Sequence, residues 1–139
     1  MAYRPYLFFG GNCRSAFTRY HEIFGGELNV MTLRDAPGPE EAPPELADMV
    51  MHASLVVGDD VLMGSDDPTA EDFGPVQGMV VSYDAVDDAE AHRVFDALAD
   101  GGSVTQTLEP TFFSTAFGMC IDRFGTPWMV VGPEPAQTS

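Results

Sequence analysis

The chain has 139 residues, of which 45% are hydrophobic and 20% charged, as is typical of one globular domain with its own core. Its 22 acidic and 6 basic residues give a formal net charge of −16. The basic residues are arginines scattered singly along the chain, so there is no basic stripe to neutralise nucleic-acid phosphates. We therefore expect neither nucleic acid nor an anionic membrane surface as a partner.

Cysteine usage indicates a reducing compartment. Cys13 and Cys120 are the only cysteines, and they form neither a Cys-x-x-Cys pair nor a Cys/His cluster at zinc-site spacing. The N-terminal apolar run is too short for a secretory signal, and no run of about 20 apolar residues is present to span a bilayer. We expect a cytoplasmic protein without disulfides, in which Cys120 is a packed, inert thiol.

In the first half, aromatic residues 4–9 predict a buried strand that ends at a Gly-Gly turn. Asn12 is a candidate N-cap for the helix that follows. The apolar positions of that helix are Ala16, Phe17, Tyr20, Ile23 and Phe24. Further strands are predicted at residues 27–34, 49–57 and 61–65, the last two forming a hairpin. The proline-rich segment 35–48 predicts an exposed acidic loop.

The second half repeats this order. After a strand at 78–83, Asp87 and Glu90 form a capping-box pattern that predicts a helix. The apolar face of that helix consists of Ala91, Val94, Phe95 and Leu98. Strands are then predicted at residues 104–108, 116–122 and 127–131. The sequence therefore predicts an α+β fold with two βαβββ modules, residues 1–68 and 76–133, in one domain spanning 1–139. We expect their sheets to curl around a shared cleft.

Three motifs accompany this duplication. They are Pro5-Tyr6-Leu7-Phe8-Phe9 before Asn12-Cys13, Met51-His52-Ala53 before Val61-Leu62-Met63, and Thr111-Phe112-Phe113 with Phe117-Gly118-Met119 before Asp122-Arg123-Phe124-Gly125-Thr126-Pro127-Trp128. Together they resemble the PhnB-like branch of the vicinal oxygen chelate superfamily, which includes glyoxalase I, extradiol dioxygenases, and bleomycin and fosfomycin resistance proteins. The resemblance implies a paired βαβββ fold, often a homodimer, with a divalent metal held by His, Gln or Glu at four strand positions.

The expected metal ligands do not carry over to this sequence. The first-strand ligand position falls near Pro5 or Tyr6, and the last-strand glutamate position falls at Met129. A thioether is a poor ligand for a hard dication. Residues 61–65 offer no carboxylate and residues 78–81 no imidazole. We therefore predict no metal and no other cofactor. Some members of the branch carry a ubiquinone-pathway methyltransferase name, but no glycine-rich nucleotide loop indicates a Rossmann-type methyl-donor site.

His52 is the single residue that most favours a functional role. An imidazole in mid-strand among apolar residues must find a hydrogen-bond partner or face the cleft, and a buried structural histidine is the alternative interpretation. Glu109, at a strand end beside the expected cleft, is a candidate base or ligand contact, against the alternative of a solvated surface carboxylate. The expected ligand-binding residues are Tyr6, Phe8, His52, Met63, Glu109, Phe112, Phe113, Met119 and Met129. Part of the aromatic and Met set is equally expected in the core, and no catalytic residue is assigned.

Three functions are consistent with these features. The leading hypothesis is a homodimer that binds a small, partly apolar molecule in the cleft without metal. The second is a metal-dependent lyase, isomerase or dioxygenase whose ligands have moved to His52 and Glu109. The third is a structural or interaction module in which side chains fill the cleft.

Overall fold

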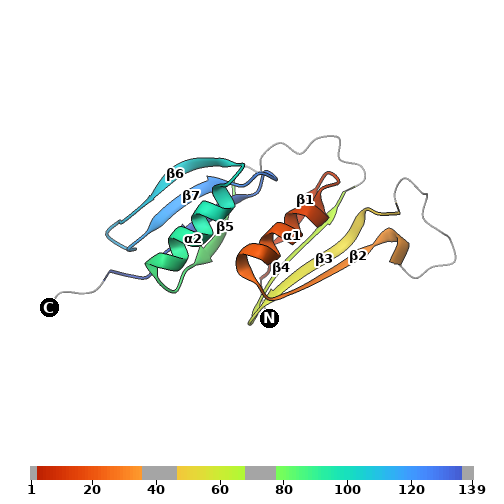
Figure 1. The fold of residues 1–139 in the computed structure, drawn as a ribbon, viewed down its shortest axis with the longest axis horizontal. Coiled ribbons are helices and arrows are strands. Elements are labelled where there is room, and N and C mark those ends of the chain that lie inside the picture. The colour runs from red at the N-terminus through yellow and green to blue at the C-terminus, as the bar shows by residue number, and fades with distance from the viewer. Residues whose placement is uncertain (1–2, 36–46, 68–77, 136–139) are drawn as a thin grey trace. The chain divides into compact units, whose positions relative to one another are not determined.

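The computed structural model describes residues 3–35, 47–67 and 78–135, and the chain divides into two compact units, Met1–Phe73 and Gly74–Ser139. The described elements of the first unit are β1 (Tyr6–Phe9), α1 (Cys13–Phe24), β2 (Glu27–Thr32), a 3₁₀ turn (Leu33–Asp35), β3 (Val50–Val57) and β4 (Asp60–Asp66). Those of the second unit are β5 (Val81–Asp84), α2 (Asp88–Ala99), β6 (Ser103–Glu109), β7 (Phe117–Ile121) and β8 (Pro127–Val131) (Figure 1).

Both units have the same sheet topology. The strand orders are β1-β4-β3-β2 and β5-β8-β7-β6. In each sheet the first strand runs parallel to its neighbour, while the other two pairs are antiparallel. The α+β class and the duplicated βαβββ order are confirmed. The single domain, the module bounds 1–68 and 76–133 and the shared cleft stay predictions.

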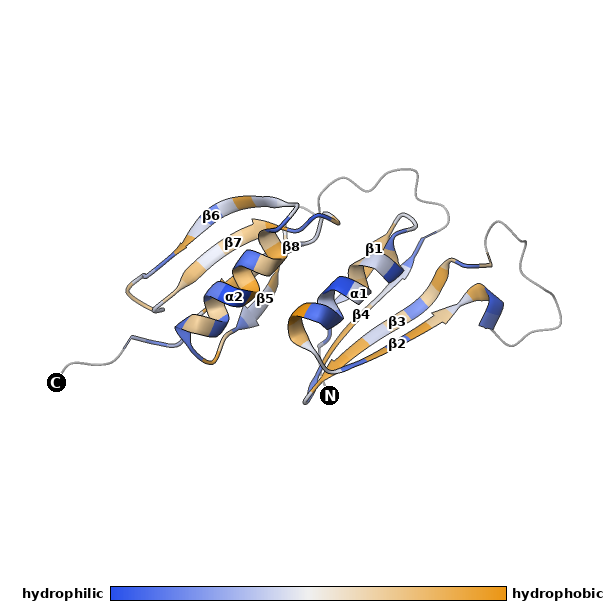
Figure 2. Cartoon of the chain, viewed as in Figure 1, coloured by the Kyte–Doolittle hydropathy of each residue, from blue (hydrophilic) through white to orange (hydrophobic). Residues whose placement is uncertain are grey.

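Helix α1 covers one face of the first sheet. Its buried side chains are Cys13, Ala16, Phe17, Tyr20 and Ile23. Four of the five predicted apolar positions are therefore buried, and the fifth, Phe24, is half-buried. Hydrophilic and hydrophobic residues alternate along the helix at helical spacing (Figure 2). At Gly64 on β4, a Cβ atom would lie 2.8 Å from both the Leu7 carbonyl oxygen and the Phe17 ring. The absence of a side chain at Gly64 therefore lets α1 approach the sheet closely.

The capping of α1 differs from the prediction. Asn12 occupies the N-cap position, but its side chain makes no capping hydrogen bond. Instead, Oδ1 of Asp66 accepts hydrogen bonds from the backbone N–H groups of Gly11 (3.1 Å) and Cys13 (2.9 Å). Oδ2 of the same carboxylate accepts from the N–H of Val50 at 3.0 Å. Asn12 is at the N-cap position as predicted, but the expected capping by its side chain was wrong. The Asp66 carboxylate of β4 accepts from the N–H of Cys13 instead, and no local pattern reveals it.

Helix α2 begins as predicted. The Asp87 side chain accepts from the Glu90 N–H at 2.8 Å. In return Glu90 accepts from the N–H of Val86, one residue before the N-cap, and from the hydroxyl of Tyr83 on β5. The predicted apolar face is buried: Ala91, Val94, Phe95 and Leu98. These contacts fix α2 on one face of the second sheet.

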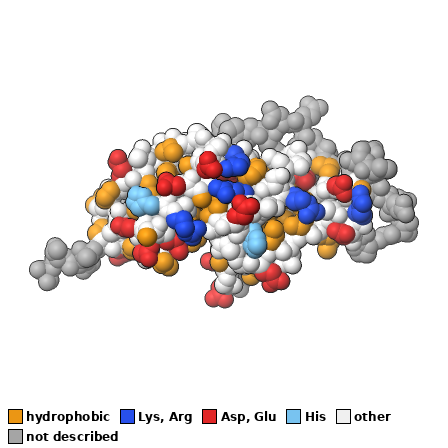
Figure 3. All heavy atoms as spheres, in the orientation of Figure 1, with side chains coloured by type: hydrophobic (Ala, Val, Ile, Leu, Met, Phe, Trp, Pro, Cys, Tyr) orange, Lys and Arg blue, Asp and Glu red, His pale blue; other side chains and the backbone are white. Residues whose placement is uncertain are grey.

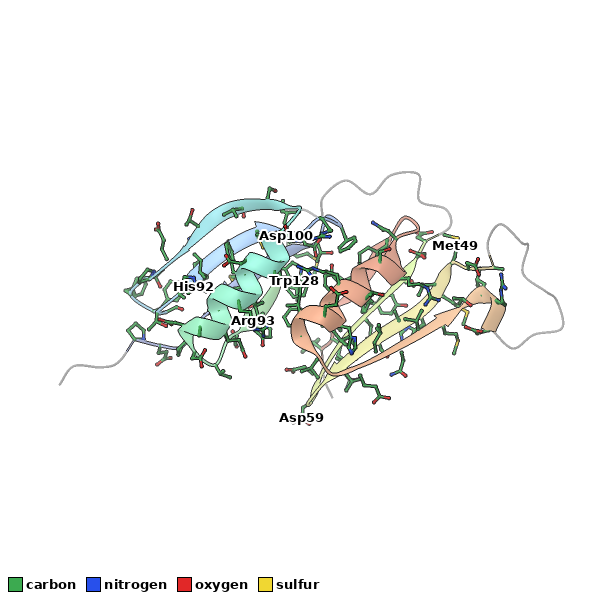
Figure 4. All side chains as sticks on the ribbon, viewed as in Figure 1. Met49, Asp59, His92, Arg93, Asp100 and Trp128 are labelled. Carbon is green, nitrogen blue, oxygen red and sulfur yellow. The ribbon has the colours of Figure 1, made fainter. Side chains whose placement is uncertain are left out.

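The Asp122 turn stabilises the second unit. Its carboxylate accepts from the N–H groups of Phe124 (2.9 Å) and Thr126 (3.0 Å), and from Nε1 of Trp128 (2.9 Å). Trp128 is buried beneath α2 at 2% exposure (Figure 4). The most specific motif of the sequence is therefore a structural turn.

Three strand boundaries differ from the predictions by two residues or more. The first strand starts at Tyr6, the second stops at Thr32 where the 3₁₀ turn begins, and β5 starts at Val81. The greater part of the predicted loop 35–48 lies outside the described residues. Among the described helices, neither combines the length and apolar character needed to cross a membrane.

Candidate functional site

Each sheet has one face packed against its own helix and one face turned away from it. Because side chains alternate along a strand, buried Ala53 and Leu55 on β3 place His52 and Ser54 on the opposite face. We call the sheet face that is turned away from the helix the helix-free face of each unit. Strand register and side-chain alternation show which residues lie on it. On the helix-free face of unit 1 these are Tyr6, Phe8, Met31, His52, Ser54 and Met63. On that of unit 2 they are Ser82, Asp84, Gln106, Glu109, Phe117, Met119, Met129 and Val131.

Tyr6 and His52 form the centre of the first helix-free face. The Tyr6 hydroxyl lies 3.2 Å from Nδ1 of His52, and the two rings are 5.7 Å apart. The ring of Phe8 lies 5.2 Å from that of Tyr6, and Met63 is the register partner of Tyr6 on β4. Four predicted ligand-binding residues thus share one face. His52 is half-buried with a polar partner on this face, rather than enclosed in the core.

The second helix-free face carries three more of the predicted residues. A Cβ atom at Gly118 would lie 2.9 Å from the Phe95 ring of α2, so its neighbours Phe117 and Met119 point away from the helix. Met119 is directly opposite Met129, and Phe117 is directly opposite Glu109. The thioethers and the carboxylate therefore lie on one surface.

Phe112 and Phe113 belong to the loop between β6 and β7. Phe113 lies with its ring edge-on to Phe117 at 5.1 Å, and Phe112 is arranged similarly on Phe113 at 5.1 Å. The Thr111 hydroxyl oxygen accepts from the N–H groups of Phe113 (3.2 Å) and Ser114 (3.1 Å), which fixes the loop. Phe113 is 42% exposed at the edge of the helix-free face, whereas Phe112 is 93% exposed.

The sequence analysis left Phe117 and Asp84 out of the site. Phe117 could have been found from its alternation with Met119, because residues two apart on a strand share a face. Asp84 had no such signal, since its position depends on the parallel pairing with β8. The shared cleft between the two units stays a prediction.

The side chains at the implied metal positions do not fit a divalent metal ion. Tyr6, an implied first-strand position, pairs with Met63, and Met129, the implied last-strand position, pairs with Ser82. These positions supply hydroxyls and thioethers, whereas hard dications prefer carboxylates and imidazoles. In the described ranges, no group of three or more His, Cys, Asp or Glu is arranged to hold a metal ion. Nothing favours the alternative in which His52 and Glu109 are relocated ligands.

The helix N-termini are also unsuited to an anionic cofactor. Backbone N–H groups at a helix start commonly bind phosphate or carboxylate. In α1 the N–H of Cys13, the first helical residue, donates to Asp66, and in α2 the N–H of Glu90 donates to Asp87. A carboxylate of the chain therefore lies at the start of each helix, where its charge disfavours a nucleotide phosphate.

Both cysteines are buried thiols. Burial, together with the nearby Asp66 carboxylate, raises the pKa of Cys13 to about 12. Burial and the Asp122 charge raise the pKa of Cys120 to about 11. Because the thiolate is the nucleophile, neither cysteine is suited to covalent catalysis near neutral pH.

Several arginines are held by acidic neighbours. Ion pairs join Arg19 to Glu22 (3.1 Å), Arg34 to Asp48 (3.0 Å) and Arg123 to Asp100 (3.1 Å). In Figure 3 the basic side chains stand among acidic ones on the side that carries the helices. These pairs sit at helix surfaces and loop ends.

Comparison with known proteins places the chain in a family. Residues 2–131 match the model of the family described as 3-demethylubiquinone-9 3-methyltransferase. Protein YjdN of Escherichia coli (strain K12) is 31% identical over 151 residues, which cover 99% of this chain and 100% of YjdN. The crystal structure of PA1353 from Pseudomonas aeruginosa is 44% identical with a TM-score of 0.84, and the match covers 97% of this chain and 99% of that chain.

More distant structures share the fold. The PhnB protein from Bacillus cereus is 22% identical with a TM-score of 0.75, over 95% of this chain and 99% of that chain. The fosfomycin resistance protein FosX from Listeria monocytogenes, solved with Mn(II), is 6% identical with a TM-score of 0.62, over 94% and 90% of the two chains. The chain therefore belongs to the family described as 3-demethylubiquinone-9 3-methyltransferase. It shares the glyoxalase/bleomycin resistance/dioxygenase fold with the PhnB protein and FosX.

Proposed function

We propose that this protein binds a small, partly apolar organic molecule on its helix-free faces, without a metal ion, as a homodimer in the cytoplasm. The observation that carries the proposal is the Tyr6–His52 hydrogen bond set beside exposed apolar side chains on the same face. Ligand sites typically combine apolar and aromatic surface with a few placed polar groups, and this face has that composition.

The exposure of the apolar residues supports binding over a purely structural role. Tyr6 is 39% and Phe8 57% exposed, although both lie on a strand whose other side is packed against α1. Covering such rings with a ligand would release about 25 cal/mol per Å² of apolar surface removed from water. If the protein were an interaction module whose side chains fill the cleft, these rings would be expected to be buried, not exposed beside a polar pair.

The chemistry of the side chains supports metal-free binding. The implied metal positions Tyr6 and Met129, with their register partners Met63 and Ser82, carry hydroxyls and thioethers. The methyltransferase activity in the family's description is not proposed for this chain, because Asp66 and Asp87 place a negative charge at the start of each helix, which disfavours an anionic cofactor there.

An NMR titration with 3-tert-butylphenol, a small molecule with an apolar body and one hydroxyl, tests the proposal. We expect saturable shifts in the amide signals of β1, β3, β7 and β8 around the helix-free faces. His52→Ala should weaken these shifts, whereas His92→Ala, which removes an exposed imidazole on α2, should not. Shifts confined to the helices, or none at millimolar phenol, would contradict the proposal.

A further inference from the structure

We propose that the helix-free face of unit 2 prefers an organic cation, an amine or quaternary ammonium group carried on an apolar body. This inference rests on the proposed function and names the chemical class of ligand for one of its two faces. It comes from one row of residues across the second sheet together with the charges of the residues around that row.

The row runs across all four strands. Asp84 on β5 pairs with Val131 on β8, Val131 pairs with Phe117 on β7, and Phe117 pairs with Glu109 on β6. Three strand spacings of about 4.8 Å separate the two carboxyl-bearing residues by about 14 Å. A molecule lying over Phe117 and Val131 would therefore have a carboxylate about 7 Å away on either side.

Neither carboxylate has a cationic partner in the described part of the chain. Both side chains are exposed, and the salt bridges found there involve other acids. The arginines of the second unit lie elsewhere: Arg93 on α2, and Arg123 bonded to Asp100 at the C-terminal end of that helix. The face therefore has negative charge at both ends and no arginine or lysine in its register rows.

Aromatic rings supply the remaining recognition. Phe113 and Phe117 meet edge-on at 75°, and Phe113 is 42% exposed, so part of this aromatic pair is accessible to a ligand. Cations are attracted to ring faces, whereas anions are repelled by them. Met119 and Met129, two residues along the strands from Phe117 and Val131, add soft apolar surface for the body of the ligand.

Charge complementarity decides between ligand classes. Each carboxylate at about 7 Å changes the affinity for a unit charge about threefold in water, and a ring contact adds a similar factor. With two carboxylates and one ring contact, a cation should therefore bind about thirtyfold more tightly than a neutral molecule of the same shape at low salt. An anion is repelled by the same two carboxylates and ring faces, and by the net charge of −16 on the whole chain.

Three probes of matched shape test the inference on the full chain. They are 3-hydroxyphenyltrimethylammonium, its neutral isostere 3-tert-butylphenol, and the anion 3-tert-butylbenzoate, each titrated by NMR at low salt. We expect the cation to bind most tightly and the benzoate most weakly, with shifts at β7 and β8. Raising the salt to about 0.5 M should shrink the advantage of the cation severalfold, because charges on an exposed face are screened.

Matched variants separate this face from the charge of the whole molecule. Glu109→Gln and Asp84→Asn should each weaken the ammonium probe about threefold and leave the phenol unchanged. Asp59→Asn removes the same charge at the tip of the β3–β4 hairpin and should have little effect (Figure 4). Phe113→Leu keeps an apolar side chain and should weaken the cation more than the phenol.

The outcomes distinguish this inference from the proposed function. If the phenol binds the face as tightly as the ammonium probe, or if Asp59→Asn weakens the cation as much as Glu109→Gln, the inference is overturned and the proposed function stands. If none of the three probes shifts the signals of either helix-free face, both are overturned.

Discussion

The hydroxyl of Tyr6 and Nδ1 of His52 lie 3.2 Å apart, although 46 positions separate the two residues in the sequence. They come from β1 and β3, with β4 between them. With the hydroxyl donating, Nδ1 accepts and the imidazole carries its proton on Nε2, which leaves an N–H to offer to a ligand. Tyr6 and His52 therefore form one hydrogen-bonded polar group on the helix-free face.

Removing the Tyr6 hydroxyl should release His52 at little cost in stability. Tyr6→Phe keeps the ring, and an exposed hydrogen bond contributes about 0.5–1 kcal/mol, so the free energy of unfolding should fall by about that much. The ¹⁵N chemical shifts of the imidazole should show Nδ1 losing its hydrogen-bonded acceptor character. Unchanged imidazole shifts would mean that the two side chains do not interact in solution.

Asp66 should be a larger determinant of stability than the N-cap residue of α1. Asp66→Ala leaves three backbone N–H groups without their acceptor and should cost about 3 kcal/mol or more. Asn12→Ala removes a side chain that makes no capping bond and should change the unfolding free energy by about 0.5 kcal/mol or less. Urea unfolding of both variants checks this, and equal effects would contradict the capping by β4.

Gly64 should tolerate no side chain. In Gly64→Ala the new methyl group would collide with the Leu7 carbonyl oxygen and the Phe17 ring, which lie on opposite sides of the α1–sheet contact. Such overpacking typically costs about 1–3 kcal/mol. Thermal unfolding should show a lower midpoint for this variant, and a midpoint equal to the wild type would argue against the close approach of α1.

Alkaline pH should destabilise the fold through its thiols. Above the ordinary thiol pKa of 9.0 the unfolded chain loses the protons of Cys13 and Cys120, while the folded chain keeps them until about pH 12 and 11. The unfolded state then binds fewer protons, so the free energy of unfolding falls as pH rises from about 9 to 12. Each thiol contributes at most about 1.4 kcal/mol per pH unit.

Unfolding by urea at pH 8, 9 and 10 measures this dependence. The chain has no lysine, so no side-chain amine titrates in the same window. Cys13→Ala/Cys120→Ala should be less stable at pH 8 but should lose stability less steeply above pH 9. In native wild type both thiols should resist a thiol-specific reagent, and rapid reaction at pH 8 would contradict their burial.

The features that the sequence predicted correctly depend on residues close together in the chain. The Asp87 cap and the apolar face of α2 depend on residues within three or four positions of one another, and both are present. The duplicated strand order followed from periodicity and turn residues in the same way.

What the sequence could not predict depends on long-range pairing. The Asp66 cap spans more than 50 positions, and the Tyr6–His52 pair exists because β4 sets the register between β1 and β3. The row from Asp84 to Glu109 likewise required the order β5-β8-β7-β6. Residue types indicated the candidates, but only the sheet register grouped them on common faces.

Native mass spectrometry tests the central claim of metal-free ligand binding most directly. The protein is purified without chelators and measured before and after incubation with zinc, manganese, nickel and iron. We predict a dimer at twice the 15.0 kDa chain mass, free of metal and carrying or accepting a small organic molecule. One metal ion retained per subunit after desalting, lost on His52→Ala, would contradict the account and restore the metal-dependent enzyme.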